Sequence, residues 1–200
     1  MGTNTTILAI GDSNTYGAGV ERNEAYPAQL EKKLTNNGYS CKVMNKGING
    51  NTSKDGAARL GEALAEYQPD IVILLFGVAD LRRGSSIEDI YHNLSEMIER
   101  ARGAGAQVII VGYQGYPADA GLEEKLQNIA QKGGVTLKND FFEMYARLSR
   151  DYQTDLIPNF LEGVLGAEGT LQDDQFSHLT GKGYAIFVEQ LYPVVVRNIR

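Results

Sequence analysis

The sequence predicts an α/β protein in which a parallel sheet lies between two layers of helices. Short apolar segments rich in β-branched residues alternate along the chain with amphipathic segments at helical spacing. The apolar segments lack strict alternation, which is typical of strands covered on both faces in a parallel sheet. Strand–helix alternation implies right-handed crossovers and a three-layer sandwich. At 200 residues, the chain is expected to form a single domain over residues 1–200.

Five strands are expected in this sheet, and the first four end at or shortly before a glycine. They are Thr6–Ile10, Val43–Met44, Ile71–Phe76, Val108–Val111 and Asp155–Ile157. For the fifth strand, Val135–Leu137 is a weaker rival that lies beside glycines.

Helices are expected where apolar residues recur at helical spacing. The segments are Tyr26–Leu34, Ala57–Tyr67, Ile87–Ala101, Phe141–Tyr152 and Gly183–Arg197. The stretch Gly115–Lys138 is interpreted as a segment that departs from the regular strand–helix alternation and contains one short helix, Leu122–Gln131.

The composition is typical of a soluble globular domain and excludes several classes of protein. Nineteen basic against twenty-five acidic side chains give a net charge of −6, which argues against nucleic acid as a partner. One cysteine, Cys41, allows no intrachain disulfide and by itself no metal site.

The longest apolar runs are far too short for a transmembrane segment. No signal peptide is visible, so a cytoplasmic location, or a secreted or periplasmic one after removal of a signal, stays open, as does the oligomeric state.

A candidate nucleophile lies where the first strand ends, in Gly11-Asp12-Ser13. Ligands of open parallel sheets bind beyond the carboxyl ends of the strands, and a serine there, after a glycine that permits a tight turn, can be an exposed nucleophile. Asp and Ser also favour turns and helix caps. The tripeptide alone is therefore also consistent with a purely structural turn.

A serine nucleophile needs a base, and the chain has two histidines. His92 lies on the polar side of an expected helix and is interpreted as a surface residue. His178 follows the pair Asp173-Asp174 in a loop before the last helix, where a carboxylate could orient its ring. Without the other motifs, His178 could equally be a surface histidine beside unrelated acids.

Two further segments follow the second and third strands. Asn45 to Thr52 is rich in glycine, which allows the backbone to approach a ligand and an amide to face an oxyanion; its simpler interpretation is a turn with Thr52 or Ser53 as helix cap. In Gly77-Val78-Ala79-Asp80, the aspartate could cap a helix or order the loop, whereas Ala79 can do no polar chemistry.

Taken together, these four ordered segments resemble the SGNH hydrolases, also called the GDSL esterase/lipase family. The likeness runs from Ile7 to Tyr184 and is greatest to the bacterial thioesterase I, lysophospholipase and arylesterase group. It implies a flavodoxin-like five-stranded parallel sheet in the order 2-1-3-4-5. It also implies a catalytic mechanism that needs no metal and no cofactor.

The resemblance assigns a role to each matching residue. Ser13 is the implied nucleophile, and His178 is the general base, oriented by an aspartate. The amides of Ser13 and Gly50 form the implied oxyanion hole, and Asp12 and Asp80 are supporting residues.

Two positions depart from the family pattern. The family's third oxyanion donor is an asparagine at the position of Ala79, so catalysis is expected to be weakened. The family aspartate stands three residues before the histidine, where this chain has Gln175; Asp174 is therefore the expected acid, with Asp173 as the alternative.

The expected function is hydrolysis of small or medium acyl esters through an acyl-enzyme on Ser13; whether thioesters are also substrates stays open. One alternative is a carbohydrate O-deacetylase of the same family, and another is a catalytically impaired binding module on this fold. A flavodoxin-like nucleotide binder is disfavoured, because the chain lacks a glycine pattern that cradles phosphate.

Overall fold

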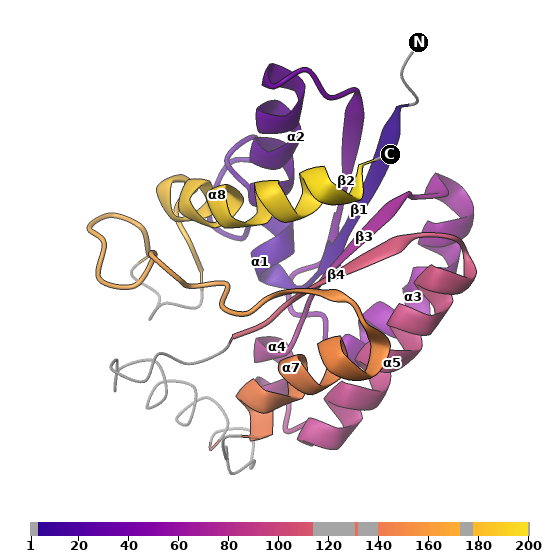
Figure 1. Ribbon diagram of the computed structural model, residues 1–200. Helices are drawn as coiled ribbons and strands as arrows, with labels where there is room; N and C mark the ends of the chain where they lie inside the picture. Colours follow the sequence, from indigo (N-terminus) through magenta and orange to yellow (C-terminus); the bar gives the residue numbers. More distant parts are fainter. Residues whose placement is uncertain (1–3, 114–130, 132–139, 173–177, 200) are drawn as a thin grey trace.

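In the computed structural model, the chain forms one five-stranded parallel sheet in the order β2-β1-β3-β4-β5 (Figure 1). The structure describes residues 4–113, 131, 140–172 and 178–199. The strands are β1 (Thr5–Gly11), β2 (Cys41–Gly47), β3 (Ile71–Leu75), β4 (Gln107–Val111) and β5 (Asp155–Ile157). This order and the five strand positions confirm the predicted sheet.

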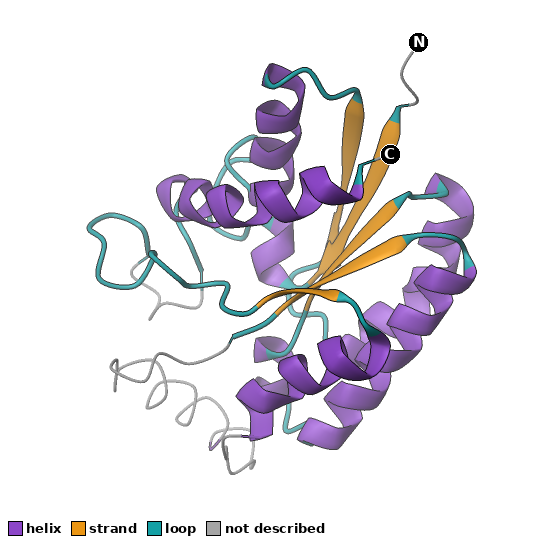
Figure 2. Ribbon diagram, viewed as in Figure 1, coloured by secondary structure: helices purple, strands orange, loops and turns teal. Residues whose placement is uncertain are grey.

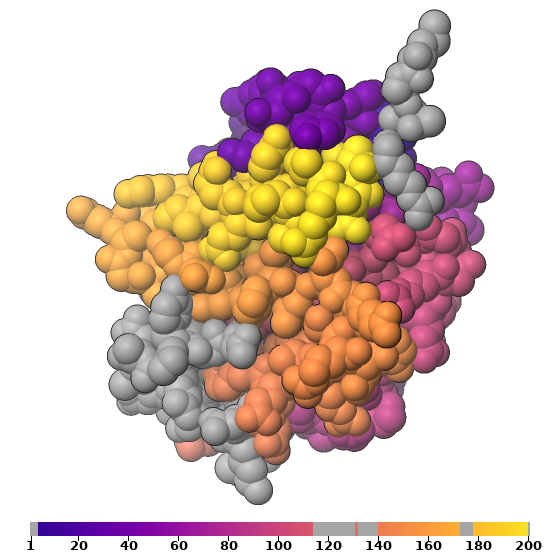
Figure 3. Space-filling model, in the orientation of Figure 1, coloured from indigo at the N-terminus to yellow at the C-terminus, as the bar shows by residue number. Residues whose placement is uncertain are grey.

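Helices cover both faces of the sheet, as the strand–helix alternation predicts (Figure 2). One layer contains α2 (Tyr26–Asn36) and α8 (Gly181–Asn198), which pack against each other, as the space-filling view also shows (Figure 3). The other contains α3 (Ser53–Tyr67), α5 (Ile87–Gly103) and α7 (Asp140–Tyr152), with α5 in contact with both neighbours. Two short helices, α1 (Ser13–Tyr16) and α4 (Val78–Arg82), follow β1 and β3 directly.

The observed helices extend beyond the predicted segments because their caps lie outside the apolar pattern. Helix α3 begins at Ser53 rather than at Ala57, since Thr52 caps it in a reciprocal capping box with Asp55. The short helices α1 and α4 were not predicted, because a single turn shows no helical periodicity. The predicted helix Leu122–Gln131 and the rival strand Val135–Leu137 lie outside the described residues, Gln131 excepted.

The sheet brings the carboxyl ends of its central strands to one edge. Gly11 at the end of β1 pairs in register with Gly47 of β2 and with Leu75 of β3. All five residues of β3 are buried, which explains their uninterrupted apolar run. Three of the four motif segments therefore leave the sheet side by side. Within the described ranges, no helix has the length and apolar character needed to cross a membrane.

Candidate active site

Ser13 lies just beyond the end of β1, as the first residue of α1. The side chain of Asp12 caps this helix by accepting a hydrogen bond from the Asn14 amide at 2.9 Å. Gly11 is required before it, because a Cβ there would lie 2.1 Å from Thr15 Oγ1. The capping role thus belongs to Asp12, and the partly exposed Ser13 is left at the edge of the sheet.

The loop after β2 is seated directly on α1. A Cβ on Gly47 would lie 2.0 Å from the backbone nitrogen of Tyr16, so only glycine allows this approach. The Ile48 amide donates to Gly11 O at 3.1 Å, which continues the pairing of the two strands past the sheet. Gly50 follows with φ of 77°, a left-handed conformation that favours glycine. These contacts bring the Gly50 segment to the edge that carries Ser13.

Arg59 of α3 ties the same loop to the end of β1. Its guanidinium donates to Lys46 O at 2.7 Å, to Gly11 O at 3.0 Å and to the side-chain oxygen of Asn51 at 2.9 Å. The planar guanidinium thereby binds backbone carbonyls at the ends of both β1 and β2. No local sequence pattern predicts this role of Arg59, because its three acceptors meet only in the folded chain.

Asp80, inside α4, holds the first residue of α3. Its carboxylate accepts hydrogen bonds from the Ser53 amide at 2.9 and 3.0 Å and from Ser53 Oγ at 2.6 Å. Burial raises the pKa of Asp80 to about 6, although the bonds from Ser53 oppose that shift. The carboxylate therefore accepts from the first residue of a helix, α3, and within the described part of the chain no side-chain hydrogen bond joins it to the loop after Gly77. The neighbouring Ala79 is half-buried and presents only a methyl group.

His178 lies in the segment that leads into α8 and is fastened to the chain that follows Ser13. Gln172 makes this connection: its amide donates to His178 O at 3.1 Å, and its side chain donates to Ala18 O and to Leu179 O, both at 2.8 Å. A Cβ on Gly19 would lie 1.9 Å from Gln172 Oε1, so this contact is close. The predicted Asp173, Asp174 and Gln175 lie outside the described residues.

His92 has surroundings of a different kind, as predicted. Its side chain is 70% exposed on α5, and its Nε2 lies 3.4 Å from a carboxylate oxygen of Glu88 on the same helix. No hydrogen bond in the described part of the chain connects His92 to the segments around Ser13.

The second carboxylate oxygen of Asp12 takes no part in the helix cap, which uses Oδ1. This oxygen, Oδ2, is buried and has no hydrogen-bond partner among the described residues. Burial raises the pKa of Asp12 to about 7; the hydrogen bond from Asn14 opposes this shift, and the negative charge of Asp80 adds to it. The group under Ser13 is therefore a carboxyl that binds a proton near neutral pH.

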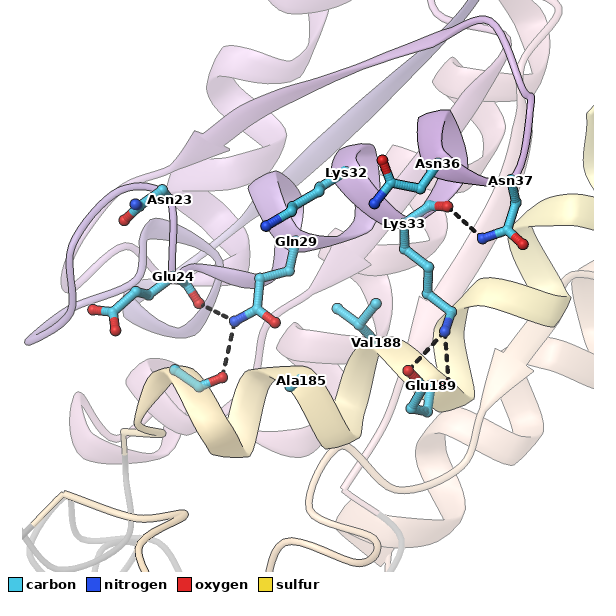
Figure 4. A pocket seen from close by; sticks show the side chains of 11 residues that line it. Asn23, Glu24, Gln29, Lys32, Lys33, Asn36, Asn37, Ala185, Val188 and Glu189 are labelled. Atoms are coloured by element: carbon cyan, nitrogen blue, oxygen red, sulfur yellow. Dashed lines mark hydrogen bonds and ion pairs between the residues drawn. The ribbon is translucent and has the colours of Figure 1, made fainter.

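A groove of about 530 Å³ between α2 and α8 lies apart from this edge (Figure 4). Two of its polar side chains, Gln29 and Lys33, bridge α2 to the start and the middle of α8. Gln29 Nε2 donates to Glu24 O at 2.6 Å and to Gly181 O at 2.8 Å, and Lys33 forms an ion pair with Glu189 at 2.7 Å. These contacts hold the two helices together and leave the carboxyl edge as the candidate active site.

The proton on Asp12 predicts an unusual pH dependence of stability. In the folded protein its pKa is about 7, whereas an unperturbed carboxyl titrates near 3.8. Between these values the folded state holds one more proton than the unfolded state, so the free energy of unfolding falls as pH rises from about 4 to about 7. The slope contributed by one such group reaches about 1.4 kcal/mol per pH unit. Urea unfolding at several pH values in this window measures it.

The matched variant is Asp12→Asn, which keeps an oxygen to accept the Asn14 amide but cannot ionise. We expect the fall in stability with pH to be smaller in this variant, with the part that Asp80 contributes left in place. An identical slope in both proteins would show that folding does not raise the pKa of Asp12.

The comparisons with known proteins agree with this geometry. Residues 9–186 match the model of the GDSL-like Lipase/Acylhydrolase family. The chain is 34% identical to Esterase TesA of Pseudomonas aeruginosa over 84% of this chain and 77% of that protein. It is 29% identical to the Arylesterase of Vibrio mimicus over 84% and 77% of the two chains.

Solved structures show the same likeness over nearly the whole chain. The crystal structure of TesA superposes with a TM-score of 0.82 at 30% identity, covering 97% of this chain and 99% of that one. AlinE4, an SGNH-hydrolase family esterase, superposes with a TM-score of 0.72 at 29% identity, covering 100% and 99%. The resemblance inferred from the four motifs is confirmed: this chain belongs to the GDSL-like lipase/acylhydrolase family.

Proposed function

We propose that this protein is a serine ester hydrolase that cleaves carboxylic esters, thioesters included, through an acyl-enzyme on Ser13. The observation that carries the proposal is the link through Gln172. Its hydrogen bonds connect His178 to Ala18, which follows Ser13 closely in the chain. This link supports the pairing of a nucleophile near the start of the chain with a base near its end. The family membership supports ester hydrolysis as the reaction class.

In the proposed reaction, Ser13 Oγ attacks the ester carbonyl while His178 takes its proton. The imidazole then gives this proton to the leaving alcohol or thiol, and a water molecule repeats the two steps to release the acid. The backbone amides of Ser13 and Gly50 would donate to the oxyanion. From the sequence alone, Asp174 is proposed to orient the imidazole, with Asp173 as the alternative.

An apolar surface beside Ser13 supports an acyl or aryl group as part of the substrate. Among the described residues, the exposed large hydrophobic side chains are Tyr16 and Ile48, at 52% and 45%. Tyr16 is the last residue of α1, which begins at Ser13, and Ile48 lies on the loop after β2, where its amide donates to Gly11 O. Tyr113, after β4, is buried, and its hydroxyl accepts from Asn14 Nδ2 at 3.3 Å.

The first test is covalent labelling. An active-site-directed phosphonate is expected to modify the protein at Ser13, and Ser13→Ala is expected to abolish both labelling and ester hydrolysis while the fold stays intact. Mass spectrometry locates the adduct, and circular dichroism checks the fold. A folded protein that resists the phosphonate would be the impaired binding module instead of a hydrolase.

The second test separates the two histidines. His178→Ala is expected to reduce kcat at least about a thousandfold, because loss of the base removes most of the triad's contribution. His92→Ala is the matched control and should retain nearly full turnover, since its side chain is exposed on α5. The opposite ranking would refute the proposed base. Asp174→Ala and Asp173→Ala, assayed side by side, identify the carboxylate that orients the ring.

The third test concerns the missing donor at position 79. Negative charge gathers on the carbonyl oxygen during attack, and one oxyanion-hole donor contributes about 10²–10³ in turnover. Ala79→Asn is therefore expected to raise kcat by a comparable factor with little change in KM, because the bond strengthens mainly in the transition state. Steady-state kinetics with an aryl ester measure both. A gain below about threefold in a folded variant would mean that the oxyanion hole is complete without this side chain.

A further inference from the structure

A cationic side chain lies beside Gly50 at the carboxyl edge. Arg83 follows α4, and its amide donates to Ala79 O at 3.2 Å, so the two residues lie one helical turn apart on the same side. A Cβ on Gly50 would lie 3.7 Å from Arg83 Nη2 and within 4 Å of no other described atom outside its own neighbours. The guanidinium therefore faces the backbone that the proposed mechanism uses for the oxyanion.

This guanidinium is only loosely paired within the described part of the chain. Its one ion-pair partner there is Asp55, at 3.8 Å from Nη1, which is too long for a hydrogen bond. The same Asp55 oxygen already accepts from the Thr52 amide at 2.8 Å and from Thr52 Oγ at 2.9 Å, which completes the cap of α3. The Arg83 side chain is 61% exposed. Its fork of donors is thus available to a ligand.

We propose that Arg83 binds an anionic group, a carboxylate or a phosphate, on the ester that occupies this site. This inference rests on the proposed hydrolase function and narrows its substrate class to esters that carry a negative charge near the scissile bond. A guanidinium suits this task because its parallel N–H groups match the oxygens of either anion. The protein carries a net charge of −6, so an exposed arginine beside the reacting group provides local attraction that the molecule as a whole does not.

The distances place the anion close to the ester carbonyl. The nitrogen of a residue lies about 2.5 Å from its own Cβ, so Arg83 Nη2 lies within roughly 6 Å of the Gly50 amide. A carboxylate separated from the ester by a few carbon atoms spans this gap. Because such a group does not react, its bond with Arg83 exists in the ground state and in the transition state alike. Loss of the contact should consequently raise KM more than it lowers kcat.

The test compares charged and neutral esters of equal size. One pair carries the charge on the leaving group: 3-acetoxybenzoate and 3-acetoxybenzamide, with 3-acetoxyphenyl phosphate as the phosphate probe. The other carries it on the acyl group: the monophenyl ester of adipic acid and its terminal amide. In at least one pair, Arg83→Gln is expected to lower kcat/KM for the charged ester about tenfold or more relative to the neutral one, mainly through KM.

Two variants control for charge and shape. Arg83→Lys keeps the charge without the fork and should retain part of the selectivity. Arg102→Gln removes the same charge at the end of α5, where that side chain donates to Gln153 O, and should leave the selectivity unchanged.

Three outcomes would overturn the inference. Equal loss for charged and neutral esters would assign Arg83 to general transition-state or structural support. Equal loss of selectivity in Arg102→Gln would indicate only the field of the whole molecule. If the unaltered protein cleaves no ester of either pair, the proposed function itself fails, and the inference fails with it.

Discussion

The candidate site depends on a backbone contact between two segments that leave the sheet side by side. Gly47 meets the backbone of Tyr16 at a distance that any side chain would prevent. This contact fixes how closely the loop that carries Gly50 approaches the turn that carries Ser13. Arg59 then holds the same two segments through three hydrogen bonds. A larger residue at position 47 would push the loop away from the serine and separate the two proposed oxyanion donors.

Two buried carboxyl groups, those of Asp12 and Asp80, hold the segments at this edge in position, and their burial lowers the stability of the folded protein. Asp80 keeps α4 and the start of α3 together through Ser53. Asp12 caps α1, but one of its oxygens is buried without a partner among the described residues. Burial without full compensation disfavours the ionised form, which is why the pKa of each group rises. Such groups are frequent at functional sites, where positioning matters more than stability.

The edge is chemically asymmetric around Gly50. Exposed apolar side chains, Tyr16 and Ile48, lie on α1 and on the loop after β2, whereas a loosely paired guanidinium, that of Arg83, lies near Gly50. In the proposed reaction, an ester would therefore meet apolar surface and a positive charge within one small region. The methyl group of Ala79 adds no polar contact of its own, so discrimination between substrates would depend on Tyr16, Ile48 and Arg83.

The strand–helix alternation, the five strands and the family could all be predicted from the amino-acid sequence, because apolar runs and glycine-ended motifs are local signals. The sequence also predicts Ser13 as the nucleophile, and it correctly placed His92 on the surface. Tertiary structure alone decided the single-turn helices α1 and α4, which have no periodicity to detect. Only the folded chain brought Arg59 to Gly11, Gln172 to Ala18 and Arg83 to Gly50. These contacts join residues far apart in the sequence, and no local pattern encodes which donor and acceptor will meet.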